Sequence, residues 1–112
     1  MDVINRSVVV IKPQEPYYNW ITELPGAIGV AKEMMEATVL LISDMLYPSG
    51  IEGYMRQIFD QIFTIQLESL ETDVKEWPQN RNYEMFLQWF KVEVHPLVLD
   101  ALEETIQKEP YK

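Results

Sequence analysis

The chain of 112 residues contains no cysteine and a single histidine, His95. Without cysteine it cannot form a disulfide, a thiolate nucleophile or a cysteine-ligated zinc or iron–sulfur centre. Metal-binding signatures with closely spaced histidines and the pattern of a calcium-binding loop are also missing. The sequence therefore predicts no metal site and no cofactor.

Glycine is scarce, and the four glycines stand at positions 26, 29, 50 and 53. Their spacing forms neither a dinucleotide-binding fingerprint nor a phosphate-binding loop with its lysine. A Gly-x-Ser-x-Gly nucleophile elbow is missing as well. Because these signatures of nucleotide-dependent and hydrolytic enzymes are absent, the sequence assigns no catalytic residue and favours a non-enzymatic protein.

Basic residues are also few: the chain has nine of them against eighteen acidic residues, and its net charge is −9. Such a chain repels nucleic acids and anionic membranes, since binding to phosphates depends on lysine and arginine. Neither is therefore an expected partner. The acids Glu68, Glu71 and Asp73 are instead candidate contacts for a basic protein partner.

Long apolar runs are lacking too. The longest, Val8–Ile11 and Val39–Ile42, fall far short of the roughly 20 residues that cross a bilayer. The first residues also lack the basic and apolar regions of a secretory signal. We therefore expect a cytoplasmic protein.

What is present is the composition of a folded chain, with 47% hydrophobic and 12% aromatic residues. The length fits one domain over residues 1–112, with ends 1–5 and 109–112 expected to be loose. The patterns described next predict an α+β fold in which a small single-layer sheet of about three strands packs against a long amphipathic helix and shorter helices.

Three segments are predicted strands. Residues 7–12 are apolar without alternation, which favours a central strand covered on both faces. Residues 38–43 form the second strand. Residues 90–99 fit either a strand or a helix, and their valines favour a strand that Pro96 would confine to an edge or a bulge.

The predicted long helix runs from Ser49 to about residue 70. Ser49 and Glu52 match a capping box, and Ile58, Phe59, Ile62 and Phe63 belong to a stripe expected to cross the sheet. Shorter helices are predicted at 17–24, 27–36 and 83–90, the last one capped by Asn82. Residues 100–108 look helical or frayed.

The least generic polar residues are Trp77, Arg81, Glu93 and His95. In one interpretation His95 is an acid or base, Glu93 orients it and Arg81 holds an anion. In the other, Glu93 and His95 form the polar face of a strand, Trp77 packs against the domain and Arg81 pairs with a carboxylate. The four residues are thus candidate contacts for a ligand or for a partner protein.

Two segments, Arg6-Ser-Val-Val-Val-Ile-Lys-Pro13 and Trp77-Pro78-x-Asn80-Arg81, resemble a family of small acidic bacterial proteins with no assigned activity. The resemblance implies a bacterial cytoplasmic α+β domain and brings no catalytic residue. Our leading hypothesis is a non-enzymatic interaction or regulatory module that binds another protein or itself through an acidic surface. The alternative is a small enzyme or ligand-binding protein that uses His95, Glu93 and Arg81.

Overall fold

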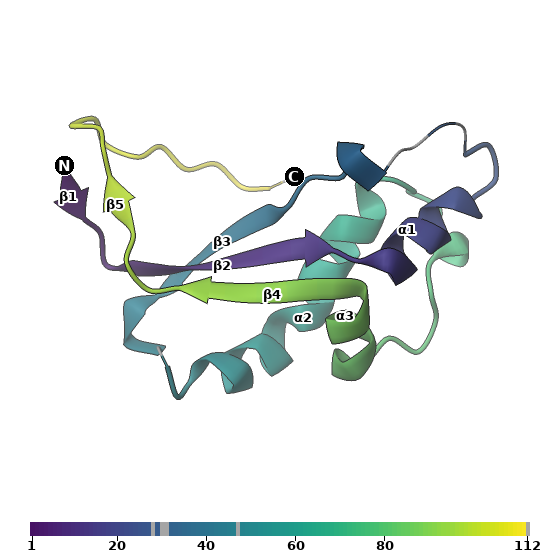
Figure 1. Cartoon of the computed structure of the whole chain (residues 1–112), viewed down its shortest axis with the longest axis horizontal. Helices are drawn as coiled ribbons and strands as arrows, with labels where there is room; N and C mark the ends of the chain where they lie inside the picture. The colour runs from purple at the N-terminus through teal and green to yellow at the C-terminus, as the bar shows by residue number, and fades with distance from the viewer. Residues whose placement is uncertain (28, 30–31, 47, 112) are drawn as a thin grey trace.

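A computed structural model of the chain describes residues 1–27, 29, 32–46 and 48–111. The elements are β1 (Asp2–Val3), β2 (Arg6–Pro13), α1 (Glu15–Thr22), β3 (Thr38–Ser43), α2 (Ile51–Glu68), α3 (Tyr83–Trp89), β4 (Phe90–His95) and β5 (Leu99–Asp100), with short 3₁₀ turns at Lys32–Met34, Asp44–Leu46 and Val74–Glu76 (Figure 1). An antiparallel sheet of order β3-β2-β4 packs against the helices, and β1 pairs with β5 in a second, smaller sheet. The predicted α+β fold with its long helix is confirmed.

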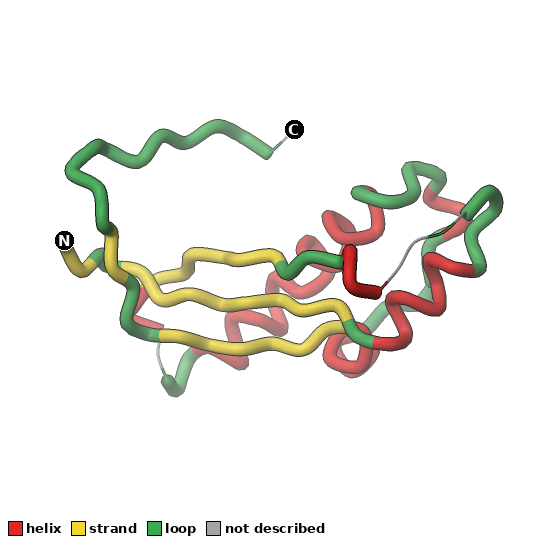
Figure 2. The backbone as a smooth tube through the Cα atoms, turned by 45° about the horizontal axis from the view of Figure 1, so that its top comes forward, coloured by secondary structure: helices red, strands yellow, loops and turns green. Residues whose placement is uncertain are grey.

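The helices lie together on one face of the main sheet (Figure 2). Side chains alternate along β2, so Ser7, Val9 and Ile11 point toward the helices and are buried. Rings from α2, α3 and β4 complete this core, because Phe63, Phe86 and Phe90 are fully buried and contact one another. As predicted, β2 is the central strand.

The other face of the sheet is uncovered, so the prediction of a strand covered on both faces is wrong. Val8 and Val10 are half-buried, and beside them on β3 Val39 and Leu41 are 57% and 50% exposed. The apolar run of β2 reflects the preference of β-branched residues for strands. A single layer of helices can bury only one of the two faces of the sheet.

The long helix α2 begins at Ile51, after Gly50, and the predicted capping box is not formed. The amide of Gly50 donates to the carbonyl of Leu46 at 2.8 Å, and the carbonyl of Gly50 accepts from Tyr54 at 3.1 Å. A turn thus leads directly into the helix, and no side chain caps its first amides. The predicted cap of α3 is confirmed, since Asn82 accepts a 2.8 Å hydrogen bond from the amide of Met85.

Residues 27–36 do not form the predicted α-helix in their described part, and residues 28, 30 and 31 lie outside the described residues. Gly26 and Gly29 adopt φ angles of +77° and +65°, in the left-handed region that breaks a right-handed helix. The ambiguous segment 90–99 contains a strand, β4, that ends before Pro96.

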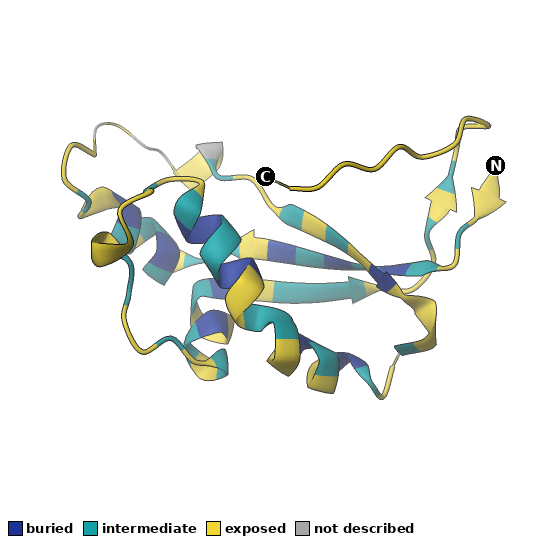
Figure 3. Ribbon diagram, turned by 180° about the vertical axis from the view of Figure 1, so that it is seen from behind, coloured by how far each residue is buried: buried dark blue, intermediate teal, exposed yellow. Residues whose placement is uncertain are grey.

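The two ends of the chain differ in structure. Residues 1–5, expected to be loose, include β1, which pairs with β5, and the amide of Ile4 donates to the carbonyl of Val98 at 3.1 Å. Residues 101–111 form no helix and are exposed along their whole length, as Figure 3 shows from behind.

Candidate functional site

Arg81 lies just before α3 and faces the helical layer. Its side chain is only 18% exposed, and its Nε donates to Asp60 Oδ1 of α2 at 2.9 Å. A second guanidinium nitrogen donates to the carbonyl of Pro78 at 3.0 Å. The guanidinium also stands 5.8 Å from the ring centres of both Phe63 and Trp77. These contacts match the expected ion pair with a carboxylate.

Trp77 is half-buried and packs against the core. Its indole N–H donates to the carbonyl of Glu71 at 2.7 Å, which ties the loop before α3 to the segment after α2. The chain then turns at Asn80, whose φ of 57° is left-handed, a conformation that asparagine tolerates well. Trp77 and Arg81 therefore hold this loop in place.

The acidic segment after α2 also uses its carboxylates locally. Glu71 Oε2 accepts from the amide of Asp73 at 3.1 Å, and Asp73 Oδ1 accepts from the amide of Lys75 at 3.0 Å. Glu68 is half-buried at the end of α2. These bonds explain Glu71 and Asp73 as loop-forming residues. A basic partner at Glu68, Glu71 and Asp73 stays a prediction.

Glu93 and His95 lie on the uncovered face of the sheet. Glu93 is surrounded by three basic groups: Lys12 at 3.1 Å, Lys91 at 3.5 Å and His95 at 3.6 Å. The hydrogen bond from Lys12 is the main reason why the pKa of Glu93 is lower than its ordinary value, and Lys91 adds to the effect. Glu93 is therefore a paired carboxylate.

The structure does not bring Arg81 to this pair. Arg81 contacts Phe63, which is buried between the helices and the sheet, whereas Glu93 projects from the opposite face. The three-residue constellation His95, Glu93 and Arg81 is thus divided between two sides of the sheet. An enzyme or ligand site built on all three residues has no geometric support.

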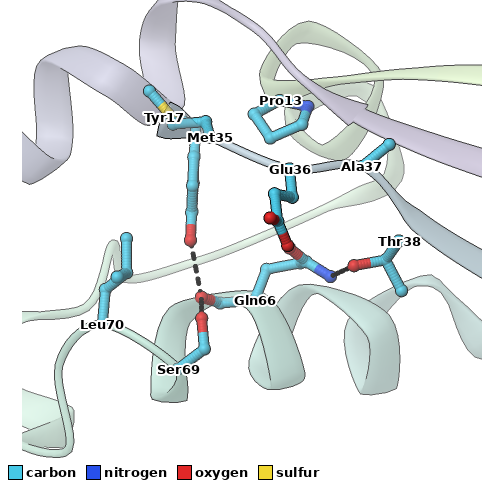
Figure 4. A pocket seen from close by; sticks show the side chains of 9 residues that line it. All are labelled: Pro13, Tyr17, Met35, Glu36, Ala37, Thr38, Gln66, Ser69 and Leu70. Carbon is cyan, nitrogen blue, oxygen red and sulfur yellow. Dashed lines mark hydrogen bonds between the residues drawn. The ribbon is translucent and has the colours of Figure 1, made fainter. Parts of the chain in front are cut away.

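A pocket of about 280 Å³ lies between α1, the start of β3 and the end of α2 (Figure 4). Tyr17 and Ser69 both donate to the carbonyl of Gln66 at 2.7 Å, and Gln66 Nε2 donates to Thr38 Oγ1 at 2.7 Å. Burial raises the pKa of Tyr17, so its phenol stays a neutral donor. Because these groups satisfy one another, we interpret the pocket as a structural junction.

The remaining candidate is the uncovered face itself, which we call the open sheet face. It comprises the side chains of Arg6, Val8, Val10, Lys12, Val39, Leu41, Ser43, Lys91, Glu93 and His95. Its centre is apolar, and three basic residues with one acidic residue give it a net positive charge, although the whole chain carries −9. Sequence reasoning missed this surface, although Val8–Ile11 and Val39–Ile42 were its signal.

No family model matches the chain, and no curated protein or solved structure matches it significantly. Within the described ranges, no group of three or more histidine, aspartate or glutamate side chains is placed to hold a metal ion. No helix in the part of the chain that the structure describes is long and apolar enough to cross a membrane. The open sheet face is the remaining candidate for a functional site.

Proposed function

We propose that this protein is a non-enzymatic interaction module that binds a partner protein on the open sheet face. The observation that carries the proposal is the exposure of Val39 and Leu41 beside Val8 and Val10, on a sheet face that no helix covers. Uncovered apolar side chains with a polar rim are typical of protein-binding surfaces.

The charge of the open sheet face indicates the chemical character of the partner. Arg6, Lys12 and Lys91 outnumber Glu93 around the apolar centre, so the open sheet face is positive on a strongly negative molecule. A matching partner places carboxylates around one or two apolar side chains. This revises the expectation from composition alone, which favoured a basic partner on an acidic surface.

The size of the surface fits a peptide or a small protein contact. The strands that build it are six to eight residues long and present an open sheet surface. Open apolar faces of this kind suit other proteins better than small molecules, which prefer concave pockets. For the same reason we propose binding and assign no catalytic step.

A selection from a random peptide library tests the proposed chemistry. We expect the purified protein to enrich peptides that combine aspartate or glutamate with leucine, isoleucine, valine or an aromatic residue. Their binding is then measured by fluorescence polarisation against a double variant, Lys12→Gln with Lys91→Gln. Removing two of the three cations should weaken binding about tenfold, and added salt should weaken binding to the wild type as well.

The matched control is a second double variant, Arg56→Gln with Lys75→Gln, which removes two exposed basic residues from α2 and from the turn at Val74–Glu76, outside the open sheet face. This control has the same net charge as the first double variant and should bind within about twofold of the wild type. Equal losses in both variants would mean that only the overall charge matters. Enrichment of basic peptides would overturn the proposal and would favour Glu68, Glu71 and Asp73 as the contacts of a basic partner.

A further inference from the structure

The strand β3 forms an unprotected edge of the main sheet. It pairs with β2 on one side, and no other strand among the described residues pairs with it on the other. Its sequence, Thr-Val-Leu-Leu-Ile-Ser, contains no charge, proline or glycine. Natural proteins usually place charged residues or proline on exposed edges to prevent pairing with another chain. The opposite edge, β4, carries Lys91 and Glu93 and is followed by Pro96.

The groove next to this edge is lined by uncharged side chains as well. This groove of about 200 Å³ between β3 and α2 is lined by Leu40, Leu41, Ile42, Tyr54, Ile58, Gln61, Ile62 and Ile65. Two copies that each carry −9 repel one another through most of their surfaces. The edge of β3 and its groove avoid this repulsion. They therefore suit a second copy of this chain.

The molecule also exposes more surface than a compact monomer. Its accessible surface of 7987 Å² exceeds the roughly 6,400 Å² typical of a monomer of this mass. This excess of about 1,600 Å² is more than the roughly 800 Å² that each partner buries in a standard protein–protein interface. The radius of gyration, 15.8 Å, is likewise above the roughly 13 Å typical of this length. The uncovered sheet and the extended residues 101–111 both contribute.

We propose that two copies pair through their β3 edges, antiparallel and about a two-fold axis perpendicular to the sheet. The two three-stranded sheets then join into one, in the order β4-β2-β3-β3-β2-β4. The grooves of the two copies meet across the axis, where their α2 helices face each other. Such a contact is closed, since the same surface is used on both sides. The pairing does not depend on the proposed function, although it joins two open sheet faces into one surface.

The competing occupant of the edge is the segment 101–111. It runs beside the β3 side of the molecule, and Tyr111 lines a hollow with Gln61 and Ile65, two residues of the groove (Figures 1 and 2). Yet it forms no backbone hydrogen bond with β3 in the described part of the chain. Its Glu103, Glu104, Glu109 and Pro110 are poor strand formers. A second copy of β3 is therefore the better match.

Analytical ultracentrifugation of the full chain over the micromolar range tests the proposal. We expect a dimer whose dissociation constant rises at least about tenfold in Leu41→Lys, because each copy then adds a positive charge to the paired edge and the two charges repel. The matched control is Leu99→Lys in β5, since Leu41 and Leu99 are equally exposed, at 50%. This variant should stay within about twofold of the wild type. Circular dichroism melting establishes that both variants fold.

Two further full-length variants separate the alternatives. Lys12→Gln impairs the proposed partner surface and should leave the dimer unchanged, so failure of one proposal is distinguished from failure of the other. The double variant Leu102→Glu with Ile106→Glu changes the C-terminal segment and should also leave the dimer unchanged. A monomeric wild type, or a dimer that persists in Leu41→Lys, overturns the proposal. So does a dimer that is lost or gained in the C-terminal variant, because that segment would then be the occupant of the edge.

Discussion

The ammonium group of Lys12 lies 3.1 Å from Glu93 Oε1, across the diagonal between β2 and β4 on the open sheet face. This hydrogen bond is the largest cause of the lowered pKa of the Glu93 carboxyl, whose ordinary value is 4.5. A carboxyl group with a lower pKa in the folded state stabilises the fold above its ordinary pKa. That contribution is lost as the pH falls through the folded-state value. The open sheet face therefore contains an acid-sensitive ion pair.

Replacing Glu93 by glutamine should lower the melting temperature at neutral pH, because Lys12 and Lys91 lose their shared partner. The difference from the wild type should shrink as the pH falls below 4.5 and vanish below the folded-state pKa. Melting curves recorded from pH 7 to about pH 3 measure this. Glu104→Gln, in the exposed C-terminal segment, serves as the control. A difference that persists at the lowest pH would contradict the ion-pair explanation.

Replacing Arg81 by alanine should destabilise the protein by about 1–2 kcal/mol, through the loss of a charged hydrogen bond and of packing on Phe63 and Trp77. The cost stays moderate because Asp60 is 54% exposed, so water solvates its carboxylate once Arg81 is gone. Asp60→Asn should cost less than about 1 kcal/mol. Urea unfolding measures both variants. A loss above about 3 kcal/mol for Arg81→Ala would mean that Asp60 is left buried and unpaired.

The two expected helix caps should respond differently to alanine. Asn82→Ala removes the bond to the amide of Met85 and should cost about 1 kcal/mol. Ser49→Ala removes no capping bond, and the free energy of unfolding should change by less than about 0.5 kcal/mol. Thermal unfolding of the two variants side by side makes the comparison. A similar loss of stability in both variants would instead indicate that Ser49 caps α2.

Two phenylalanines on α2 should differ in what their removal costs. Phe63 is fully buried among the rings of Phe86, Trp89 and Phe90, so Phe63→Ala should cost about 3–5 kcal/mol. Phe59 is half-buried and contacts Tyr83 and Phe86, and Phe59→Ala should cost about half as much. Chemical denaturation gives both values. A larger loss for Phe59 would mean that this edge of α2 is covered by another chain.

Local chemistry allowed much of the fold to be predicted. The β-branched runs of β2 and β3, the helical spacing along α2 and the side chain of Asn82 act within a few residues, and each produced the expected element. The capping box at Ser49 and, in its described part, the helix over 27–36 were wrong for an equally local reason. Backbone bonds to Leu46 and the left-handed Gly26 and Gly29 outweighed the patterns in side chains.

The candidate sites were less accessible to prediction, because they depend on contacts between distant parts of the chain. Residue type alone indicated that Arg81 would find a carboxylate, but only the packing of α2 against the loop selected Asp60. The same packing separated Arg81 from Glu93 and His95, which follow it closely in sequence but lie on the other side of the sheet.

The sequence by itself determined the class of the fold, its central strand, its long helix and the acidic charge, since these follow from short-range preferences and from composition. Only the tertiary structure decided that one sheet face is open, that this face is positive and that β3 is left with a free edge. The physical reason is that a strand has the same local pattern whether its second face is covered or bare. That difference depends on how many layers the rest of the chain supplies, and here the helices supply one.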